Sequence, residues 1–286
     1  MKIGFIADFF ADEIPGGGEL NNDELMRLLS ANDHEVLKIK SEMCTDGAFE
    51  HLEKEGYTHF IVANFAALPT LAKKELAHKT YIIYEHDHKY LAGRNPAIFK
   101  DFLAPKSALV NIEFYKEAKA VICQTTFHQK IVKKNLEIDN IISVGGNLWS
   151  NDILDFLSEL ATVEKKEKCS VMVSPIPHKN TADAIKFCNL KKMEYELVPP
   201  LPYRDFLSRL GQNNTLVFLP KTPETLSRIV VEARMMGMKT ITNNLVGATK
   251  EDWFKLKGAE LVDAMRAKRE EIVTTVIGLL SDVSQS

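Results

Sequence analysis

The stretch MKIGFIADFF ADEIPGGGEL NNDELMRLLS ANDHEVLKIK, residues 1–40, predicts the fold. Residues 3–7 form a short apolar run that is typical of a buried strand, and a polar, glycine-rich loop over residues 12–18 follows it. Residues 22–31 carry leucine and methionine at helical spacing, and residues 34–39 predict a second strand. Strand, glycine loop, helix and strand in this order form a βαβ unit, the building block of parallel sheets.

The same alternation continues along the whole chain. Up to residue 150 it predicts further helices and strands at 48–54, 59–63, 68–76, 80–84, 107–116, 120–123, 127–135 and 141–144. Beyond residue 150 it predicts others at 152–161, 170–173, 181–189, 195–198, 203–210, 216–219, 226–236, 239–242, 251–254 and 264–280. The charged run 164–168 is predicted to be a solvated connection. We therefore predict two successive Rossmann-like α/β domains, residues 1–150 and 151–286, with ligands in a cleft between them, beyond the carboxyl ends of the strands.

The composition is that of an ordinary globular protein. The 286 residues are 45% hydrophobic and 26% charged, and 36 basic against 39 acidic side chains give a net charge of −3. This balance argues against a dedicated nucleic-acid-binding or anionic-membrane-binding protein, which would usually carry a basic excess. The chain has no apolar stretch of membrane-spanning length, and its four cysteines form no CxxC pair. We therefore expect a cytoplasmic protein with free thiols and no transmembrane segment.

Gly16, Gly17 and Gly18 precede the first predicted helix, at a position where a ligand would bind. Glycines there allow a close approach of the backbone, and the amides at a helix N-terminus suit a phosphate group. The spacing matches neither the dinucleotide-binding GxGxxG pattern nor the P-loop pattern GxxxxGK[ST]. A flexible surface loop is therefore the alternative for this stretch.

His86, Asp87 and His88 follow the predicted strand 80–84. A His-x-His pair can ligate a metal, but the sequence offers no identifiable third ligand. Histidine at the end of a strand also serves as a polar substrate contact or as a structural hydrogen-bonding residue. We predict no metal site here and keep both of the other roles open for His86.

Glu224 and Glu232 frame a predicted helix in the stretch PETLSRIVVEA, residues 223–233. About two helical turns separate them, which is too far for paired acid–base work on one atom but suits an elongated ligand along a helix N-terminus. Glu232 could take two ribose hydroxyls, and Ser227 and Arg228 at the helix start could hold phosphate. An ordinary amphipathic helix with exposed glutamates is the alternative.

Lys179 follows the predicted strand 170–173. An anion-binding lysine of an α/β domain belongs at this position, beyond the carboxyl end of a strand. A lone lysine is exposed by default, so an ordinary surface residue is the alternative.

In this order, these features make the sequence resemble the GT-B glycosyltransferases, most closely the retaining family 4 type. The resemblance covers nearly the whole chain and rests on Gly16-Gly17-Gly18-Glu19, His34-Glu35-Val36, His86-Asp87, Lys179, the Glu-x7-Glu element from Glu224 to Glu232, and Ala233, Gly237 and Asn243 after it. It implies a GT-B fold, two Rossmann-like domains whose parallel sheets face a central cleft. The first domain would lie on the acceptor side and the second would bind the donor.

The resemblance also implies roles at the matched positions. Glu232 would bind the nucleotide ribose, and Glu224 would contact the donor sugar near the reacting end. Lys179 would neutralise the diphosphate as it departs, in place of a metal. His86 would contact the transferred sugar, and the glycines of the first domain would pack against the donor diphosphate or the acceptor.

Three departures separate the chain from the family pattern. Ser174 stands where the family usually places an arginine, five residues before the lysine. Thr225 and Ser227 replace glycines that usually follow the first glutamate, and Arg228 stands where an apolar residue is common. We therefore hypothesise that Arg228 supplies the phosphate charge that Ser174 cannot.

Together, these observations predict a cytoplasmic glycosyltransferase that moves a sugar from a UDP-, GDP- or ADP-sugar to an unidentified glycan, lipid or small-molecule acceptor. By resemblance, it retains the anomeric configuration and needs no metal or other cofactor. We expect no nucleic-acid partner. The alternatives are a sugar-nucleotide epimerase or hydrolase on the same fold and a catalytically weak nucleotide- or glycan-binding protein. An NAD-dependent oxidoreductase is disfavoured because the dinucleotide fingerprint is missing.

Overall fold

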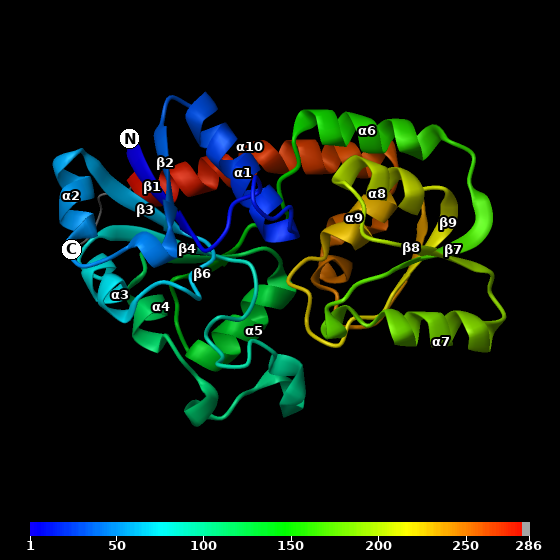
Figure 1. Cartoon of the computed structure of the whole chain (residues 1–286), viewed down its shortest axis with the longest axis horizontal. Coiled ribbons are helices and arrows are strands. Elements are labelled where there is room, and N and C mark those ends of the chain that lie inside the picture. The colour runs from blue at the N-terminus through cyan, green and yellow to red at the C-terminus, as the bar shows by residue number, and fades with distance from the viewer. Residues whose placement is uncertain (282–286) are drawn as a thin grey trace. The chain divides into compact units, whose positions relative to one another are not determined.

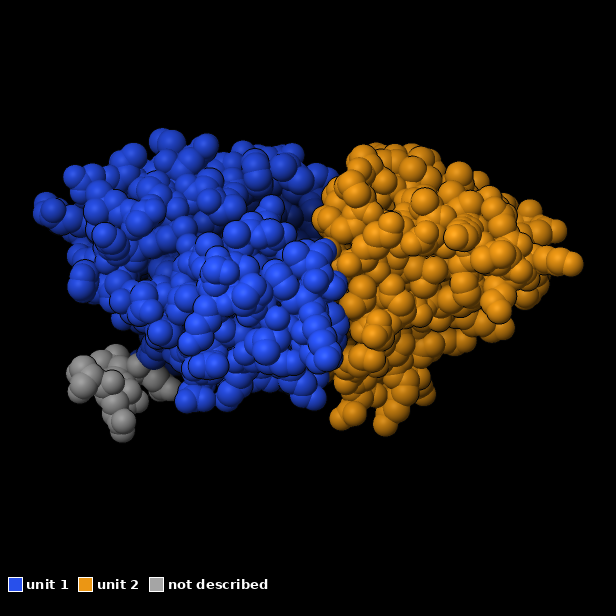
Figure 2. All heavy atoms as spheres, turned by 90° about the horizontal axis from the view of Figure 1, so that it is seen from below, with its two compact units in different colours: residues 1–148, 269–286 blue, residues 149–268 orange. Residues whose placement is uncertain are grey.

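The computed structural model describes residues 1–281, which divide into two compact units (Figure 2). Within the described residues, the first unit contains residues 1–148 and 269–281, and the second contains residues 149–268. The sequence pattern assigns everything after residue 150 to a second domain. The structure differs for residues 269–281, which belong to the first unit because their apolar side chains complete its core.

The first unit is built on a six-stranded sheet in the order β2-β1-β3-β4-β5-β6, in which all neighbouring strands are parallel (Figure 1). Its strands are β1 (Lys2–Ala7), β2 (Glu35–Lys40), β3 (Tyr57–Val62), β4 (Thr80–Glu85), β5 (Ala120–Cys123) and β6 (Ile141–Ser143). The helices of this unit are α1 (Gly17–Ala31), α2 (Ala48–Lys54), α3 (Thr70–Leu76), α4 (Ile112–Glu117), α5 (Thr126–Leu136) and the C-terminal part of α10 (Ala259–Ser281).

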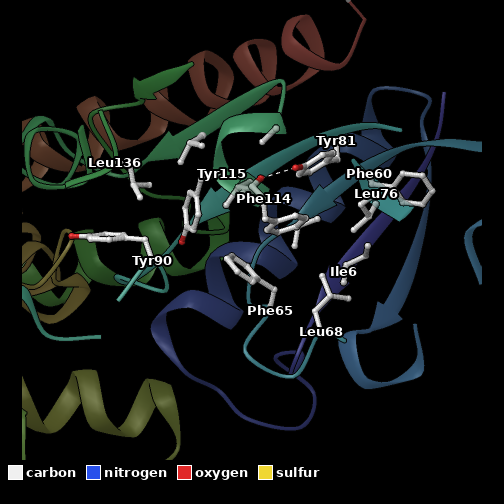
Figure 3. Packing of buried hydrophobic residues seen from close by; sticks show 14 of the residues in the cluster. Ile6, Phe60, Phe65, Leu68, Leu76, Tyr81, Tyr90, Phe114, Tyr115 and Leu136 are labelled. Carbon is white, nitrogen blue, oxygen red and sulfur yellow. Dashed lines mark hydrogen bonds between the residues drawn. The ribbon is translucent and has the colours of Figure 1, made fainter. Parts of the chain in front are cut away.

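Alternate side chains of the central strands enter two hydrophobic cores, as the pleat of a strand requires. Ile82 and Tyr84 of β4 pack with α1 and α10 on one face of the sheet. Tyr81 and Ile83 point to the other face, which α2, α3, α4 and α5 cover. Figure 3 shows this second core, where the Tyr81 hydroxyl donates a hydrogen bond to the Phe114 carbonyl at 2.6 Å. Covering both faces with helices is what a parallel sheet needs.

The second unit is built on a four-stranded parallel sheet in the order β10-β9-β7-β8. Its strands are β7 (Lys166–Met172), β8 (Tyr195–Val198), β9 (Asn213–Phe218) and β10 (Lys239–Thr242). On one face pack α6 (Asn151–Thr162), α8 (Tyr203–Leu210), α9 (Arg228–Met235) and the first turns of α10, while α7 (Thr181–Lys191) covers the other. The predicted alternation of strands and helices is confirmed in both units.

The glycine stretch differs from its prediction as a loop. The helix α1 begins at Gly17 rather than at residue 22, so that Gly17 and Gly18 lie in its first turn and Gly16 is the N-cap. Glycine is a poor helix former in solution, and here the helix extends because tertiary packing outweighs that local cost.

The charged run 164–168 is also not simply a connection, because β7 begins at Lys166. Lys166 Nζ lies 3.5 Å from the carboxylate of Glu196 on β8, and Lys168 Nζ lies 3.4 Å from that of Glu194, next to the same strand. Opposite charges across neighbouring strands favour the extended conformation.

Two predicted helices are shorter or tighter than expected. The helix predicted over residues 107–116 begins only at Ile112 in α4, because residues 106–108 form a separate 3₁₀ turn. The segment predicted as helical over residues 251–254 forms a 3₁₀ turn, Asp252–Lys255. None of the helices within residues 1–281 is long and apolar enough to cross a bilayer.

Candidate functional site

Lys179 and Glu224 meet beyond the carboxyl ends of β7 and β9. Lys179 ends a 3₁₀ turn (Pro177–Lys179) that follows β7, and Glu224 lies in the segment between β9 and α9. The Lys179 ammonium donates to both carboxylate oxygens of Glu224, at 2.9 and 3.0 Å, and lies 5.9 Å from the ring centroid of Phe218. Both side chains are partly buried. The two residues predicted to act on the donor are therefore in direct contact through this ion pair.

Backbone hydrogen bonds hold Glu224 at this edge of the sheet. Its amide donates to the Leu245 carbonyl at 2.8 Å, and its carbonyl accepts from the Gly247 amide at 2.9 Å. Asn243, which follows β10, donates through Nδ2 to the Pro220 carbonyl at 2.7 Å. The segments that follow β9 and β10 are therefore tied to each other, which restricts the motion of the Glu224 carboxylate.

Glu232 is buried inside α9, with 3% of its side chain exposed. Its Oε1 accepts hydrogen bonds from Trp149 Nε1 at 2.9 Å and from the Tyr203 hydroxyl at 2.6 Å. Burial and the neighbouring carboxylate raise the pKa of Tyr203, so the phenol stays a donor. Sequence reasoning missed Trp149 and Tyr203, because they lie 83 and 29 residues from Glu232 and no local spacing connects them.

Arg228 belongs to the same cluster. Its Nε lies 3.3 Å from Glu232 Oε1, and its guanidinium carbon lies 4.4 Å from the ring centroid of Trp149. A further hydrogen bond goes to the Tyr203 hydroxyl at 3.2 Å, and only 10% of the side chain is exposed. The charge of Arg228 is therefore compensated by Glu232 in this structure. That Arg228 binds a donor phosphate stays a prediction.

Ser227 is the N-cap of α9 and has a left-handed backbone, with φ 77° and ψ 85°. Its buried hydroxyl has no hydrogen-bond partner within residues 1–281 and does not cap the helix. A buried, unsatisfied hydroxyl costs about 1–3 kcal/mol, and a non-glycine residue with this backbone is strained. Strain and an orphaned donor at a helix N-terminus are typical of a site that a polar ligand completes.

His86 follows β4 in the first unit, and both of its ring nitrogens have partners. Its Nε2 lies 2.6 Å from Asn22 Oδ1, and its Nδ1 lies 2.7 Å from Gln124 Nε2. The ring also stacks on Tyr84, with 5.1 Å between the centroids. A carbonyl oxygen accepts and an amide nitrogen donates, so this arrangement selects the neutral imidazole that carries its proton on Nε2. No motif or spacing in the sequence indicates Asn22 or Gln124 as partners of His86.

Two of the three predicted glycines have close neighbours. A Cβ added to Gly18 would lie 3.3 Å from Cγ of His86, so the absence of a side chain lets α1 approach the imidazole. A Cβ at Gly16 would lie 2.2 Å from the Glu19 carboxylate. Burial raises the pKa of Glu19. The structure therefore brings Gly18 and His86 together, as members of one predicted site.

A buried ionic cluster fixes the chain around His86. The Lys89 ammonium donates to Glu85 at 3.0 Å and to Asp87 at 2.7 Å, and the Tyr115 hydroxyl donates to the other oxygen of Glu85. Burial raises the pKa of Glu85 to about 7. Burial opposes ionisation of Asp87 as well, but the charge of Lys89 lowers its pKa. Asp87 is thus a partner within this cluster.

His88 points into the core rather than toward a ligand. Its Nδ1 lies 3.3 Å from the Tyr90 hydroxyl, and its ring meets that of His128 edge-on at 5.2 Å. Burial lowers the pKa of His128 well below its ordinary value. In the part of the chain that the structure describes, no three His, Cys, Asp or Glu side chains gather in a way that could hold a metal ion.

Comparisons by sequence find no relative: no family model matches the chain, and neither does any curated protein. Solved structures do match it. HepE from Anabaena in complex with UDP and glucose has a TM-score of 0.57 at 14% identity, over 98% of this chain and 92% of that chain. An α-glucosyltransferase in complex with UDP and a 13-mer DNA has a TM-score of 0.52 at 11% identity, over 98% and 92%. These neighbours are GT-B glycosyltransferases, and they confirm the predicted α/β fold with two parallel sheets.

Proposed function

We propose that this protein is a glycosyltransferase whose donor is a nucleotide-diphospho-sugar. The observation that carries the proposal is the group formed by Lys179, Glu224 and the orphaned hydroxyl of Ser227 at the N-terminus of α9, all beyond the carboxyl ends of the second sheet. The neighbours on the same fold were solved with UDP or UDP-glucose, which supports a UDP-sugar as the first donor to test.

In the proposed reaction, the bond between the sugar and the diphosphate breaks and the diphosphate keeps the electron pair, while a hydroxyl oxygen of the acceptor forms the new bond to the anomeric carbon and its proton passes to the departing diphosphate. Negative charge grows on the leaving group, and preorganised donors stabilise it most. The donor diphosphate would replace Glu224 as the partner of Lys179. The Ser227 hydroxyl and the first amides of α9 would complete the anion site. Glu224, released from the lysine, would then accept hydrogen bonds from hydroxyls of the donor sugar.

The buried cluster around Glu232 would hold the nucleoside. Trp149, Tyr203 and Arg228 all contact Oε1, which sets the rotation of the carboxylate, and we assign Oε2 to the ribose hydroxyls. For His86 the proposed role is contact with the transferred sugar. Retention of the anomeric configuration, independence from metal and a cytoplasmic location complete the proposal, the last supported by four buried free cysteines.

Thermal unfolding with UDP-, GDP- and ADP-glucose, followed by donor turnover, tests this function. A true donor at about a hundred times its Kd should stabilise the fold by about 2.7 kcal/mol. Lys179→Ala and Glu224→Gln should each lower turnover about a hundredfold, because each removes a charged contact to the reacting group. Lys186→Ala, an exposed lysine on α7, is the control and should keep full turnover.

Several outcomes would contradict the proposal. If none of the three nucleotide sugars stabilises the fold, the proposed donor site is wrong. Full turnover by Glu224→Gln would remove the proposed role of this carboxylate. Complete conversion of the donor to an epimer or to free sugar, with no acceptor glycosylated, would argue for one of the other enzymes. Loss of activity in EDTA, restored by a divalent cation, would show that Lys179 does not replace a metal.

A further inference from the structure

The chain between β4 and α4 forms a loop of the first unit whose two ends are joined by backbone hydrogen bonds. At its base, the Val110 amide donates to the Tyr90 carbonyl at 2.8 Å, and the Ala92 amide donates to the Ala108 carbonyl at 3.2 Å. Between these contacts the chain forms three short 3₁₀ turns, and in Figure 1 it lies beside α5 at the lower edge of the unit. We call residues 92–108 the β4–α4 loop.

The β4–α4 loop is held firmly on α5. Asn135 of that helix accepts a hydrogen bond from the Ala104 amide at 2.9 Å and donates one to the Phe102 carbonyl at 2.8 Å. The Lys134 ammonium donates to the Asp101 carbonyl at 2.8 Å. Asp101 and Phe102 both have left-handed backbones, with φ of 53° and 61°. These contacts set the direction of the side chains at the tip of the loop.

Two large aliphatic side chains on this loop face solvent. Ile98 is 69% exposed and Leu103 is 51% exposed. Leaving such a side chain in water forgoes about 1.5–3 kcal/mol that burial would supply. A single exposed side chain of this kind is ordinary, but two on one anchored loop indicate a surface that a partner covers.

Exposed lysines are frequent on the loop and on the helix that holds it. Lys100 and Lys106 lie on the loop, Lys130, Lys133 and Lys134 lie on α5, and all five are exposed. Asp101 is the one carboxylate in residues 92–110 and 126–136 of the sequence, although the whole chain has a net charge of −3. Lys133 pairs with Asp139, which follows α5, at 3.1 Å, but of the described residues none supplies a carboxylate within ion-pair distance of Lys100, Lys106 or Lys130. The surface is therefore locally cationic in an acidic protein.

We propose that the β4–α4 loop and the exposed lysines of α5 bind an anionic membrane surface. Ile98 and Leu103 enter the boundary between headgroups and acyl chains, and the lysines contact the lipid phosphates. Apolar insertion combined with electrostatic attraction is the pair of signals that makes peripheral binding firm.

The chemistry of the surface favours a membrane over the other large partners. Nucleic-acid phosphates also bind lysine, but the exposed aliphatic side chains Ile98 and Leu103 would gain little burial against a phosphate backbone. Interfaces with proteins are depleted in lysine, whereas an anionic bilayer accepts lysines beside aliphatic side chains. This proposal does not depend on the proposed glycosyltransferase activity.

Co-sedimentation of the full chain with vesicles tests the proposal. One set of vesicles is phosphatidylcholine alone, and the other is an equal mixture of phosphatidylcholine and phosphatidylglycerol. The wild type should bind the mixed vesicles, and added salt should weaken the binding. Lys100→Ala with Lys106→Ala should lower the partition coefficient about 25-fold, because each lysine contributes about fivefold. Ile98→Ser with Leu103→Ser should lower it at least about tenfold.

The matched control lies at the end of α7 in the second unit. Leu190 is 72% exposed and is followed by the exposed Lys191 and Lys192, so L190S with K191A and K192A removes similar groups elsewhere. This variant should bind like the wild type, and circular dichroism should show that all variants are folded. No binding to the mixed vesicles, or an equal loss in the control, would overturn the proposal. Self-association that disappears in the Ile98 and Leu103 variant, without vesicle binding, would also overturn it and identify a second copy as the partner.

Discussion

Arg228 and Arg234 lie on the same short helix but have different partners. Arg228 packs on Trp149 and pairs with Glu232, inside the cluster that we propose holds the nucleoside. Arg234 donates instead to three backbone carbonyls of the chain that follows, those of Phe254, Lys255 and Leu256. Arg228 therefore positions the Glu232 carboxylate, whereas Arg234 ties α9 to the backbone of residues 254–256.

Arg228→Ala should weaken the binding of UDP about tenfold or more. The reason is that Glu232 is almost fully buried and loses its ion-pair partner at 3.3 Å, so that its carboxylate can rotate away from the ribose; a loss of about 1.4 kcal/mol corresponds to tenfold in Kd. Arg234→Ala should lower the stability of the fold and leave the Kd unchanged. Titration calorimetry, at a temperature where both variants are folded, measures the difference. Equal losses of affinity in the two variants would show that Arg228 has no special part in the site.

At the scale of elements, α1 and α10 are joined by a buried ion pair. A guanidinium nitrogen of Arg269 on α10 bonds Oε1 of Glu24 on α1, and both residues are buried. Glu24 also accepts two hydrogen bonds from Arg27, which is exposed. A buried charge that loses its partner keeps the cost of desolvation, so this contact should be sensitive to single substitutions.

Arg269→Met should lower the free energy of unfolding by about 3–5 kcal/mol, because it leaves Glu24 with one partner at the surface. The double variant Glu24→Gln with Arg269→Met should recover most of the loss, since no unpaired charge remains. Urea denaturation gives both values. Arg266→Ala, which breaks a partly exposed pair with Asp155 on α6, is the control and should cost at most about 1 kcal/mol. A loss for Arg269→Met no larger than the control would contradict the account.

For the whole molecule, the main feature is that the first unit is not continuous in sequence. Residues 1–148 form its sheet, but the second half of α10 supplies Ile272, Val273, Val276 and Leu280 to one of its two cores. All four side chains are almost fully buried. A boundary placed at residue 150 therefore cuts through a core, although it follows the order of the elements.

A fragment of residues 1–150 should not fold stably. Each of the four missing side chains would have contributed about 1.5–3 kcal/mol of burial, and the total is comparable to the whole stability of a domain, about 5–15 kcal/mol. Residues 1–148 joined to 269–286 by a glycine-serine linker should regain a cooperative thermal transition. The cooperativity of the two fragments is compared by circular dichroism during heating. An equally cooperative transition for the shorter fragment would show that α10 is dispensable.

Much of the fold follows from local patterns, and the predictions fail where tertiary packing overrides a local preference. The helix at residues 48–54 and the strand at 120–123 have the bounds that periodicity predicts, because buried faces impose their period on the sequence. The start of α1 at Gly17 was missed because glycine argues against a helix until packing is known. At Ser227, a positive φ occupies a position where the family pattern has glycine, and no propensity shows that a serine would accept this backbone.

The sequence by itself determined the two parallel α/β sheets and brought Lys179, Glu224 and the start of α9 to the strand ends, because these depend on spacing along the chain. Only the tertiary structure decided that Trp149 and Tyr203 hold Glu232, or that Asn22 and Gln124 hold His86. Those contacts join residues far apart in sequence, and no local pattern encodes them. The local distribution of charge also depends on the tertiary structure. A net charge of −3 is a sum over the chain, whereas the packing of the β4–α4 loop on α5 brings Lys134 against the loop next to Lys100.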